Sequence, residues 1–253
     1  MQSLTRFIQS LSCCYKVKET LTFYVIFHQK NFPENIPDIN CFVYLGANER
    51  VQKEIHPDTK HPIVYEYDTP SYNPIYQMLN FCDNSVILNI QPPPTHFIGI
   101  CQYDMYIDKE NMILAMNSLT EPNSMVGFYD YHVETILDEL NEDDYNSMLD
   151  IYNAKFNTSH TIESLSDTPF FLLNTFIIPS YFFLHLQSTL KLLLPTVFKL
   201  LKYDMRHIAG TLERVNALII ACAIKEKALI HFFSDAITDV REQTAQCIRI
   251  NRD

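Results

Sequence analysis

Two acidic residues follow a short apolar segment in the middle of the chain. Residues 97–101 predict a buried strand, and Asp104 and Asp108 come soon after its end. Open α/β sheets present ligand-binding groups at the carboxyl ends of their strands, so an acid at this position is well placed to contact a ligand. Carboxylate oxygens suit Mg²⁺ or Mn²⁺, which often bind substrate phosphates as well. The structural alternative is that Asp104 caps the next turn and Asp108 is solvated.

Other polar residues are predicted at the ends of two further strands. Glu66 and Asp68 end the strand predicted over residues 63–67, where residues two apart share a face. They could bind a nucleotide ribose, or only lead into a loop. His28 follows the strand predicted over residues 21–27, a position that suits a phosphate or nucleotide contact as well as a surface histidine.

Two more candidates lie in the second half of the chain. Asn174 interrupts residues 170–178, which otherwise predict a buried apolar strand. A buried amide must be hydrogen-bonded, by a bound sugar or by neighbouring protein groups. Glu213 and Arg214 lead the helix predicted over residues 211–225. Glu213 could interact with the positive end of the helix dipole, contact a sugar or act as a catalytic base. Arg214 could bind a phosphate or pair with an acidic residue.

The order of the predicted elements indicates an α/β fold. A helix is predicted to begin at Asn73 and Pro74 and to run to about residue 89, before the prolines at 92–94. It lies among four short strands, as in a mostly parallel sheet. These strands are residues 21–27, 41–45, 63–67 and 97–101. The second half is more helical, with helices predicted at 132–140, 141–156, 181–201 and 211–225 and a helical tail at 235–247. Strands are predicted at 125–129 and 170–178. Residues 228–233 are predicted to be a strand or a helix continuation, and residues 112–118 fit either a strand or a helix.

The composition predicts one large domain with a sizeable core. The chain has 253 residues, of which 47% are hydrophobic and 19% are charged. A net charge of −11 argues against nucleic-acid binding, which needs clustered Lys and Arg. The four glycines form neither a GxGxxG motif nor a P-loop motif, so any nucleotide must be held in another way.

Several features predict a cytoplasmic location. The seven cysteines include no CxxC pair, which indicates free thiols in a reducing compartment and no zinc site. No signal peptide is evident in residues 1–20. The most hydrophobic stretch, residues 170–201, is broken by polar residues and prolines, so no transmembrane segment is expected.

Three segments and one residue pair occur in an order that matches a known family. The segments are Asn73-Pro74-x-Tyr76 leading to Leu88-Asn89, FIGICQY at 97–103, and NTFII at 174–178 followed by GTLER at 210–214; the pair is His28 with Lys30. In order and spacing they resemble a family of glycosyltransferase-like proteins from bacterial capsular and exopolysaccharide loci, with relatives in large DNA viruses. The resemblance spans roughly residues 22–227.

One segment departs from the family pattern. The family's HYRRY reads Gln102-Tyr103-Asp104-Met105-Tyr106 here, so both arginines are missing and an acid is present. In the family the arginines could contact donor phosphates, whereas Asp104 would suit a divalent cation. The Asp-x-Asp metal motif usual for this fold is replaced by Asp104 with Asp108.

The resemblance implies a GT-A-like fold and a glycosyltransferase of polysaccharide biosynthesis or viral glycosylation. A donor half, about residues 20–110, would bind a nucleotide-diphosphate sugar, and an acceptor half, about residues 111–253, would bind a glycan. Asp104 and Glu213 would be catalytic, and Asp104 with Asp108 would hold Mn²⁺ or Mg²⁺. The donor-binding residues would be His28, Lys30, Glu66, Asp68, Asn73, Gln102, Tyr103, Asn174 and Arg214.

Two other functions stay open at the level of sequence. A non-catalytic relative would keep the fold and bind a glycan or a protein, which the missing Asp-x-Asp motif favours. A hydrolase of glycosidic or sugar-phosphate bonds would need two carboxyl groups about 5–10 Å apart across one cleft.

Overall fold

The computed structural model describes most of the second half of the chain and selected parts of the first. The described residues are 21–27, 39, 41–46, 81, 83–102, 104–137, 140–202 and 207–239. The strand predicted at 63–67 and the helix start at Asn73 lie outside these residues. So do the predicted site residues His28, Lys30, Glu66, Asp68, Asn73 and Tyr103.

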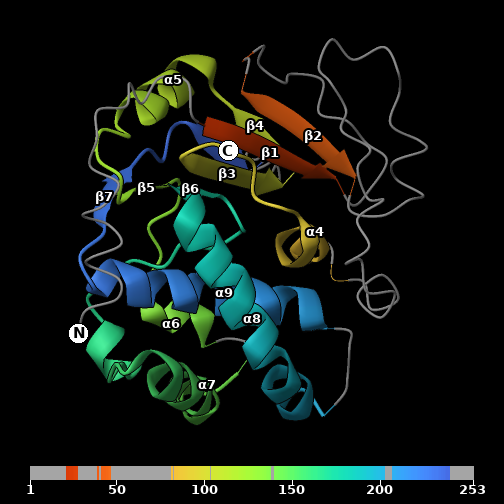
Figure 1. Cartoon of the computed structure of the whole chain (residues 1–253), viewed down its shortest axis with the longest axis vertical. Coiled ribbons are helices and arrows are strands. Elements are labelled where there is room, and N and C mark those ends of the chain that lie inside the picture. The colour runs from red at the N-terminus through yellow and green to blue at the C-terminus, as the bar shows by residue number, and fades with distance from the viewer. Residues whose placement is uncertain are drawn as a thin grey trace, which may run out of the picture.

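A six-stranded mixed sheet forms the centre of the molecule (Figure 1), with the strand order β2-β1-β3-β6-β5-β7. The strands are β1 (Leu21–Phe27), β2 (Phe42–Gly46), β3 (Phe97–Gln102), β5 (Ser124–Gly127), β6 (Phe176–Pro179) and β7 (Leu229–Phe232). Strand β1 is parallel to β2 and to β3, and β5 is parallel to β7. Strand β6 is antiparallel to both of its neighbours, β3 and β5. A small second sheet pairs β4 (Met105–Ile107) with β8 (Ile237–Asp239).

Helices cover the two faces of the large sheet unequally. Figure 1 shows α4, α8 and α9 on one side, with α6 and α7 farther from the sheet, and α5 on the opposite side. The helices are α4 (Asn84–Asn89), α5 (Lys109–Asn117), α6 (Val133–Ile136), α7 (Glu142–Phe156), α8 (Ser180–Leu200) and α9 (Ile208–Lys225), with a short 3-10 turn at Glu163–Leu165. The predicted α/β fold, with a mixed, mostly parallel sheet and a more helical C-terminal half, is therefore confirmed.

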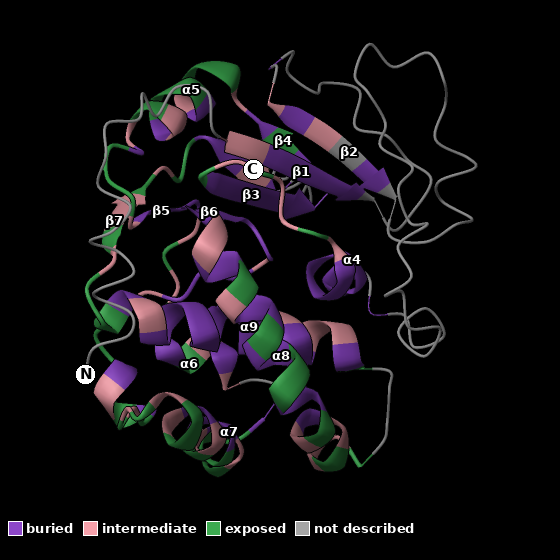
Figure 2. Cartoon of the chain, in the orientation of Figure 1, coloured by how far each residue is buried: buried purple, intermediate pink, exposed green. Residues whose placement is uncertain are grey.

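The strands alternate between two apolar cores. In β1, Tyr24 and Ile26 pack with the helices α4, α8 and α9, whereas Phe23 and Val25 pack toward α5. Side chains of a strand point alternately to the two faces of the sheet, and both faces are covered here. The strands therefore contain almost continuous apolar sequence, and Figure 2 shows the centre of the sheet as buried.

Helix α4 is held in place by a side chain of α8. The Nε2 group of Gln187 donates hydrogen bonds to the carbonyl oxygens of Ile87 and Ile90, at 2.8 and 2.7 Å. Carbonyl groups at the end of a helix have no partner within the helix, so a buried amide from a neighbour satisfies them. This contact fixes the short helix α4, whose N-terminal end borders the site described below.

Several predicted elements are confirmed. Strand β1 has the predicted bounds, and α8 and α9 lie where helices were expected. Strand β7 lies where a strand or a helix continuation was expected. Helix α7 begins at a capping box in which the Asn141 side chain accepts from the backbone N–H of Asp144 and the Asp144 side chain accepts from that of Asn141. The ambiguous residues 112–118 belong mainly to helix α5.

Two predictions from sequence are wrong. The strand expected over residues 170–178 is reduced to Phe176–Pro179, because Leu173 and Asn174 adopt positive φ angles of 59° and 43° and turn the chain. The tail expected to be helical from residue 235 contains strand β8, where pairing with β4 outweighs local helix propensity.

In the described part of the chain, no helix is both long and apolar enough to cross a membrane.

Gly99 allows the close contact between β1 and β3. Its register partner is Phe23, and a Cβ atom at Gly99 would lie 2.0 Å from the Phe23 ring. That ring cannot move easily because it stacks on Phe42 at 4.8 Å and meets Phe128 edge to face at 6.4 Å.

We predict that Gly99→Ala lowers the free energy of unfolding by about 1–3 kcal/mol, the usual range for overpacking a core. Urea denaturation followed by circular dichroism measures the change. An unfolding midpoint equal to that of the wild type would show that Phe23 has room to rearrange.

Candidate functional site

The sheet brings several predicted polar residues to one edge. Strand β3 ends at Gln102, and Asp104 follows as a half-buried residue before β4. Strand β6 runs antiparallel to β3, with Phe176 opposite Ile100, so Asn174 precedes β6 at the edge where β3 ends. This is the edge at which an open α/β sheet binds its ligands.

Helix α9 contributes Glu213 to this edge. The Nε2 group of Gln102 donates a hydrogen bond to Oε2 of Glu213 at 3.4 Å. Because α9 begins at Ile208, Glu213 lies in its second turn rather than in its first, where it was expected. The effect of the helix dipole is strongest in the first turn. The dipole alone therefore accounts for an acidic residue at position 213 less well than the sequence suggested.

Asp83 is a third carboxyl group in this region, and the sequence analysis did not identify it. It immediately precedes α4 and is 3% exposed. Burial, followed by the negative charge of Glu213, raises the pKa of Asp83 from its ordinary value of 3.8 to about 7. Asp104 raises it further, whereas the hydrogen bond from Asn174 acts in the opposite direction. Glu213 and Asp104 therefore both lie close enough to Asp83 to raise its pKa.

Asparagine side chains form a buried network around Asp83. The Nδ2 group of Asn174 donates to Oδ2 of Asp83 and, at 3.2 Å, to Oδ1 of Asn84. The Nδ2 group of Asn216 donates to Oδ1 of Asn84 and to Oδ1 of Asn174, both at 2.8 Å. Asn84 in turn donates to the carbonyl oxygen of Ala209 at 3.1 Å. The network therefore joins α4, the turn before β6 and α9.

The backbone at Asn174 is adapted to this network. Leu173 and Asn174 both lie in the left-handed region, which asparagine tolerates better than most residues and a leucine rarely adopts. Such a conformation persists where surrounding contacts enforce it, and it is common at functional sites. The hydrogen bonds of Asn174 to Asp83 and Asn84 are contacts of this kind.

Asp108 has a structural role in the described chain. Its Oδ1 accepts a hydrogen bond from the backbone N–H of Asn111 at 2.8 Å and caps helix α5. The described residues contain no group of three or more His, Cys, Asp or Glu side chains arranged to hold a metal ion. A cation bound by Asp104 and Asp108 would have to compete with this cap and draw most of its oxygen ligands from a substrate. Cation binding by Asp104 and Asp108 therefore stays a prediction.

Arg214 lies beside Glu213 and is half-buried. Its Nη1 group donates to the carbonyl oxygen of Gly210, one turn earlier in α9, at 3.2 Å. This contact holds the guanidinium group near the N-terminal end of the helix. Binding of a phosphate by Arg214 stays a prediction.

Asp83, Asn84 and Asn216 were missed although the sequence contains a signal for each of them. Asp83 and Asn84 precede the apolar residues of α4, and Asn216 is an isolated amide within the apolar sequence of α9. The argument that selected Asn174, that a polar side chain in an apolar segment must find partners, applies equally to these three residues.

Comparison with known proteins supports the fold. No family model matches the sequence, and no curated protein matches it. Among solved structures, the apo structure of WbbM, a bifunctional glycosyltransferase, matches with a TM-score of 0.57 at 14% sequence identity. The match covers 87% of this chain and 46% of that chain, so this chain spans about half the length of its structural neighbour. The fold of this chain is therefore similar to that of part of this glycosyltransferase.

The raised pKa of Asp83 predicts a dependence of stability on pH. The folded chain binds this proton more tightly than the unfolded chain, so the stabilisation is complete below pH 3.8 and is lost as the pH rises through about 7. Relative to Asp83→Asn, the free energy of unfolding of the wild type should fall by about 2–4 kcal/mol between pH 4 and pH 8. Urea denaturation at both pH values measures the difference.

The control for this experiment is Asp150→Asn, which changes an exposed acid of α7. It should follow the wild type at both pH values. If Asp83→Asn also followed the wild type, Asp83 would titrate as an ordinary carboxyl group, and its burial beside Glu213 and Asp104 would be wrong.

Proposed function

We propose that the chain transfers a sugar from a nucleotide-diphosphate sugar to a hydroxyl group of a glycan acceptor. The observation that carries this proposal is the convergence of Asp104, Glu213 and Asp83 at the carboxyl end of β3 in a glycosyltransferase fold. Sugar transfer needs stabilisation of the leaving diphosphate and a base for the attacking hydroxyl group. Carboxyl groups in different environments at one edge of the sheet can take these two separate roles.

Glu213 is the proposed base. In an inverting transfer, the acceptor oxygen attacks the anomeric carbon, the bond from that carbon to the diphosphate oxygen breaks, and the hydroxyl proton passes to a carboxylate. Glu213 is half-buried and accepts a hydrogen bond from Gln102 at 3.4 Å, which orients its carboxylate. Arg214, on the same turn of α9, is the proposed partner for the negative charge of the donor.

Asp104 is proposed to act on the donor side, together with a divalent cation. One carboxylate plus diphosphate oxygens is a usual environment for Mg²⁺ or Mn²⁺, and such a cation would offset charge on the leaving group. Gln102 ends β3 just before Asp104 and could bind a hydroxyl group of the donor sugar, whereas the buried Asn174 side chain holds Asp83 and Asn84. The resemblance to capsular and exopolysaccharide glycosyltransferases supports sugar transfer in general, whereas the acid at Asp104 departs from the pattern of that family.

A thermal-shift screen tests the donor class. Nucleoside diphosphates and nucleotide sugars are added with and without Mn²⁺ to the wild type, Asp104→Asn and Asp108→Asn. A ligand at about 100 times its dissociation constant stabilises by roughly 2.7 kcal/mol, which is readily measured. We expect one nucleotide to raise the melting temperature only with Mn²⁺ in the wild type, and Asp104→Asn to abolish this rise.

Asp108→Asn is the matched control, because Asn caps a helix about as well as Asp and the substitution removes only the charge. Retention of the Mn²⁺-dependent shift in this variant would assign the cation to Asp104 alone. A nucleotide shift unaffected by Mn²⁺ and by Asp104→Asn would place the phosphate site elsewhere. The absence of any nucleotide shift would instead favour a glycan- or protein-binding module.

Glu213→Gln tests the chemical step once the donor is known. Removal of a general base usually costs about 10²–10⁴-fold in rate, so kcat should fall by this factor while the donor-induced thermal shift is kept. Product formation from the labelled nucleotide sugar measures kcat. A variant with wild-type turnover would exclude Glu213 as the base.

A further inference from the structure

A cavity lies at the opposite edge of the sheet from the acidic site. It has a volume of about 300 Å³ and is bordered by Asn123, just before β5, by the first turns of α8 and by the C-terminal end of α9. Glu226 follows α9 directly, and a rise of about 1.5 Å per residue places it roughly 20 Å along the helix from Glu213. The two regions are therefore separate.

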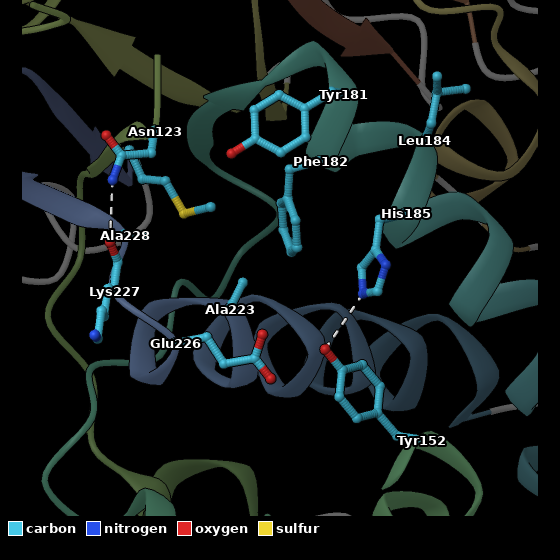
Figure 3. Close-up of a pocket in the computed structure, with 11 residues that line it drawn as sticks. Asn123, Tyr152, Tyr181, Phe182, Leu184, His185, Ala223, Glu226, Lys227 and Ala228 are labelled. Atoms are coloured by element: carbon cyan, nitrogen blue, oxygen red, sulfur yellow. Dashed lines mark hydrogen bonds between the residues drawn. The ribbon is translucent and has the colours of Figure 1, made fainter. Parts of the chain in front are cut away.

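Aromatic rings form much of the cavity wall. Tyr152, Tyr181, Phe182 and His185 all line it (Figure 3). Phe182 stacks on His185 with ring centroids 5.3 Å apart, and Tyr152 meets His185 edge to face at 5.8 Å. The hydroxyl group of Tyr152 lies 3.3 Å from Nε2 of His185. These contacts hold the rings in place without a ligand, so the wall is preformed.

The charge that faces the cavity is negative. Figure 3 shows the carboxylate of Glu226 directed toward the space beside Tyr152 and Phe182, and the amino end of Lys227 directed away from that space. His160 contacts Oε1 of Glu226 at 3.1 Å and thereby orients the carboxylate. Burial lowers the pKa of His185, although Glu226 opposes this effect, so His185 adds little positive charge.

The rest of the lining limits the kind of ligand. Met125, Leu184, Ala223 and Ala228 supply apolar surface, and Leu184 is 53% exposed. Most of the lining surface is apolar, which suits a ligand with apolar substituents better than a sugar, and an anion would be repelled by Glu226. A cation with apolar substituents fits both features, because aromatic faces and a carboxylate attract it while apolar walls contact its carbon atoms.

We propose that this cavity binds an organic ammonium ion that carries apolar substituents. The proposal is independent of the sugar-transfer reaction, because it depends only on Glu226 and the aromatic wall. The cavity is large enough for a small quaternary ammonium compound such as choline or benzyltrimethylammonium.

Isothermal titration calorimetry with the full chain tests the proposal. The probes are choline, benzyltrimethylammonium and 3,3-dimethylbutan-1-ol, which is the neutral analogue of choline with the same shape. We expect saturable binding of both cations and an affinity for choline at least about tenfold above that for the neutral analogue, as expected for desolvated contacts of a cation with aromatic rings. Equal affinities for choline and its neutral analogue, or no saturable binding of either cation, would overturn the proposal.

Two variants assign the binding to this cavity. Glu226→Gln keeps the shape of the side chain and should reduce the affinity for choline about tenfold while leaving that for the neutral analogue unchanged. Ala223→Met should weaken binding of every probe, because the larger side chain occupies the cavity. Glu134→Gln removes an exposed acid of α6 and serves as the charge control. Cation binding unchanged in both cavity variants, with melting temperatures that confirm folding, would contradict the proposal.

Discussion

The arrangement of the acidic site depends on burial of the Asp83 carboxyl group among asparagine side chains. A buried carboxyl group and three buried amides would be costly without partners, and in this chain they are partners for one another. The four contributing residues belong to three segments: the start of α4, the turn before β6 and the middle of α9. The hydrogen bonds among these side chains therefore connect three segments that are far apart in sequence, although Oδ1 of Asn216 is buried without a hydrogen-bond partner. The unusual backbone at Leu173 and Asn174 is a consequence of the same requirement.

This network lies beside the groups proposed for the reaction. The charge of Glu213 contributes to the raised pKa of Asp83, and Gln102 connects Glu213 to the end of β3. The acids thus have distinct environments, since Asp83 is deeply buried whereas Asp104 and Glu213 are half-buried. Burial and the two neighbouring acids therefore favour the protonated form of Asp83 at this edge of the sheet.

Helix α9 connects the two regions that we assign to binding. Its second turn carries Glu213 and Arg214, its middle carries Asn216, and the cavity that we assign to an ammonium ion lies at its far end. The helix is almost entirely buried between these ends and packs against α8. This buried helix holds both regions in fixed positions. The polar residues Thr211, Glu213, Arg214 and Asn216 interrupt its apolar sequence, and each makes a hydrogen bond.

Sequence by itself determined the class of fold and many elements, because strand and helix periodicity and capping are local properties. Strand β1 and the capping box of α7 are clear examples. The positions of Asp104 and Asn174 at one edge follow from the order of strands once β6 is known to be antiparallel to β3. Sequence did not determine that Asn174 lies in a turn, that residues 237–239 pair with β4, or that Asp108 caps a helix. Only the tertiary structure brought Asp83, Asn84 and Asn216 together, because a buried polar side chain signals that it needs a partner without indicating which distant residue provides it.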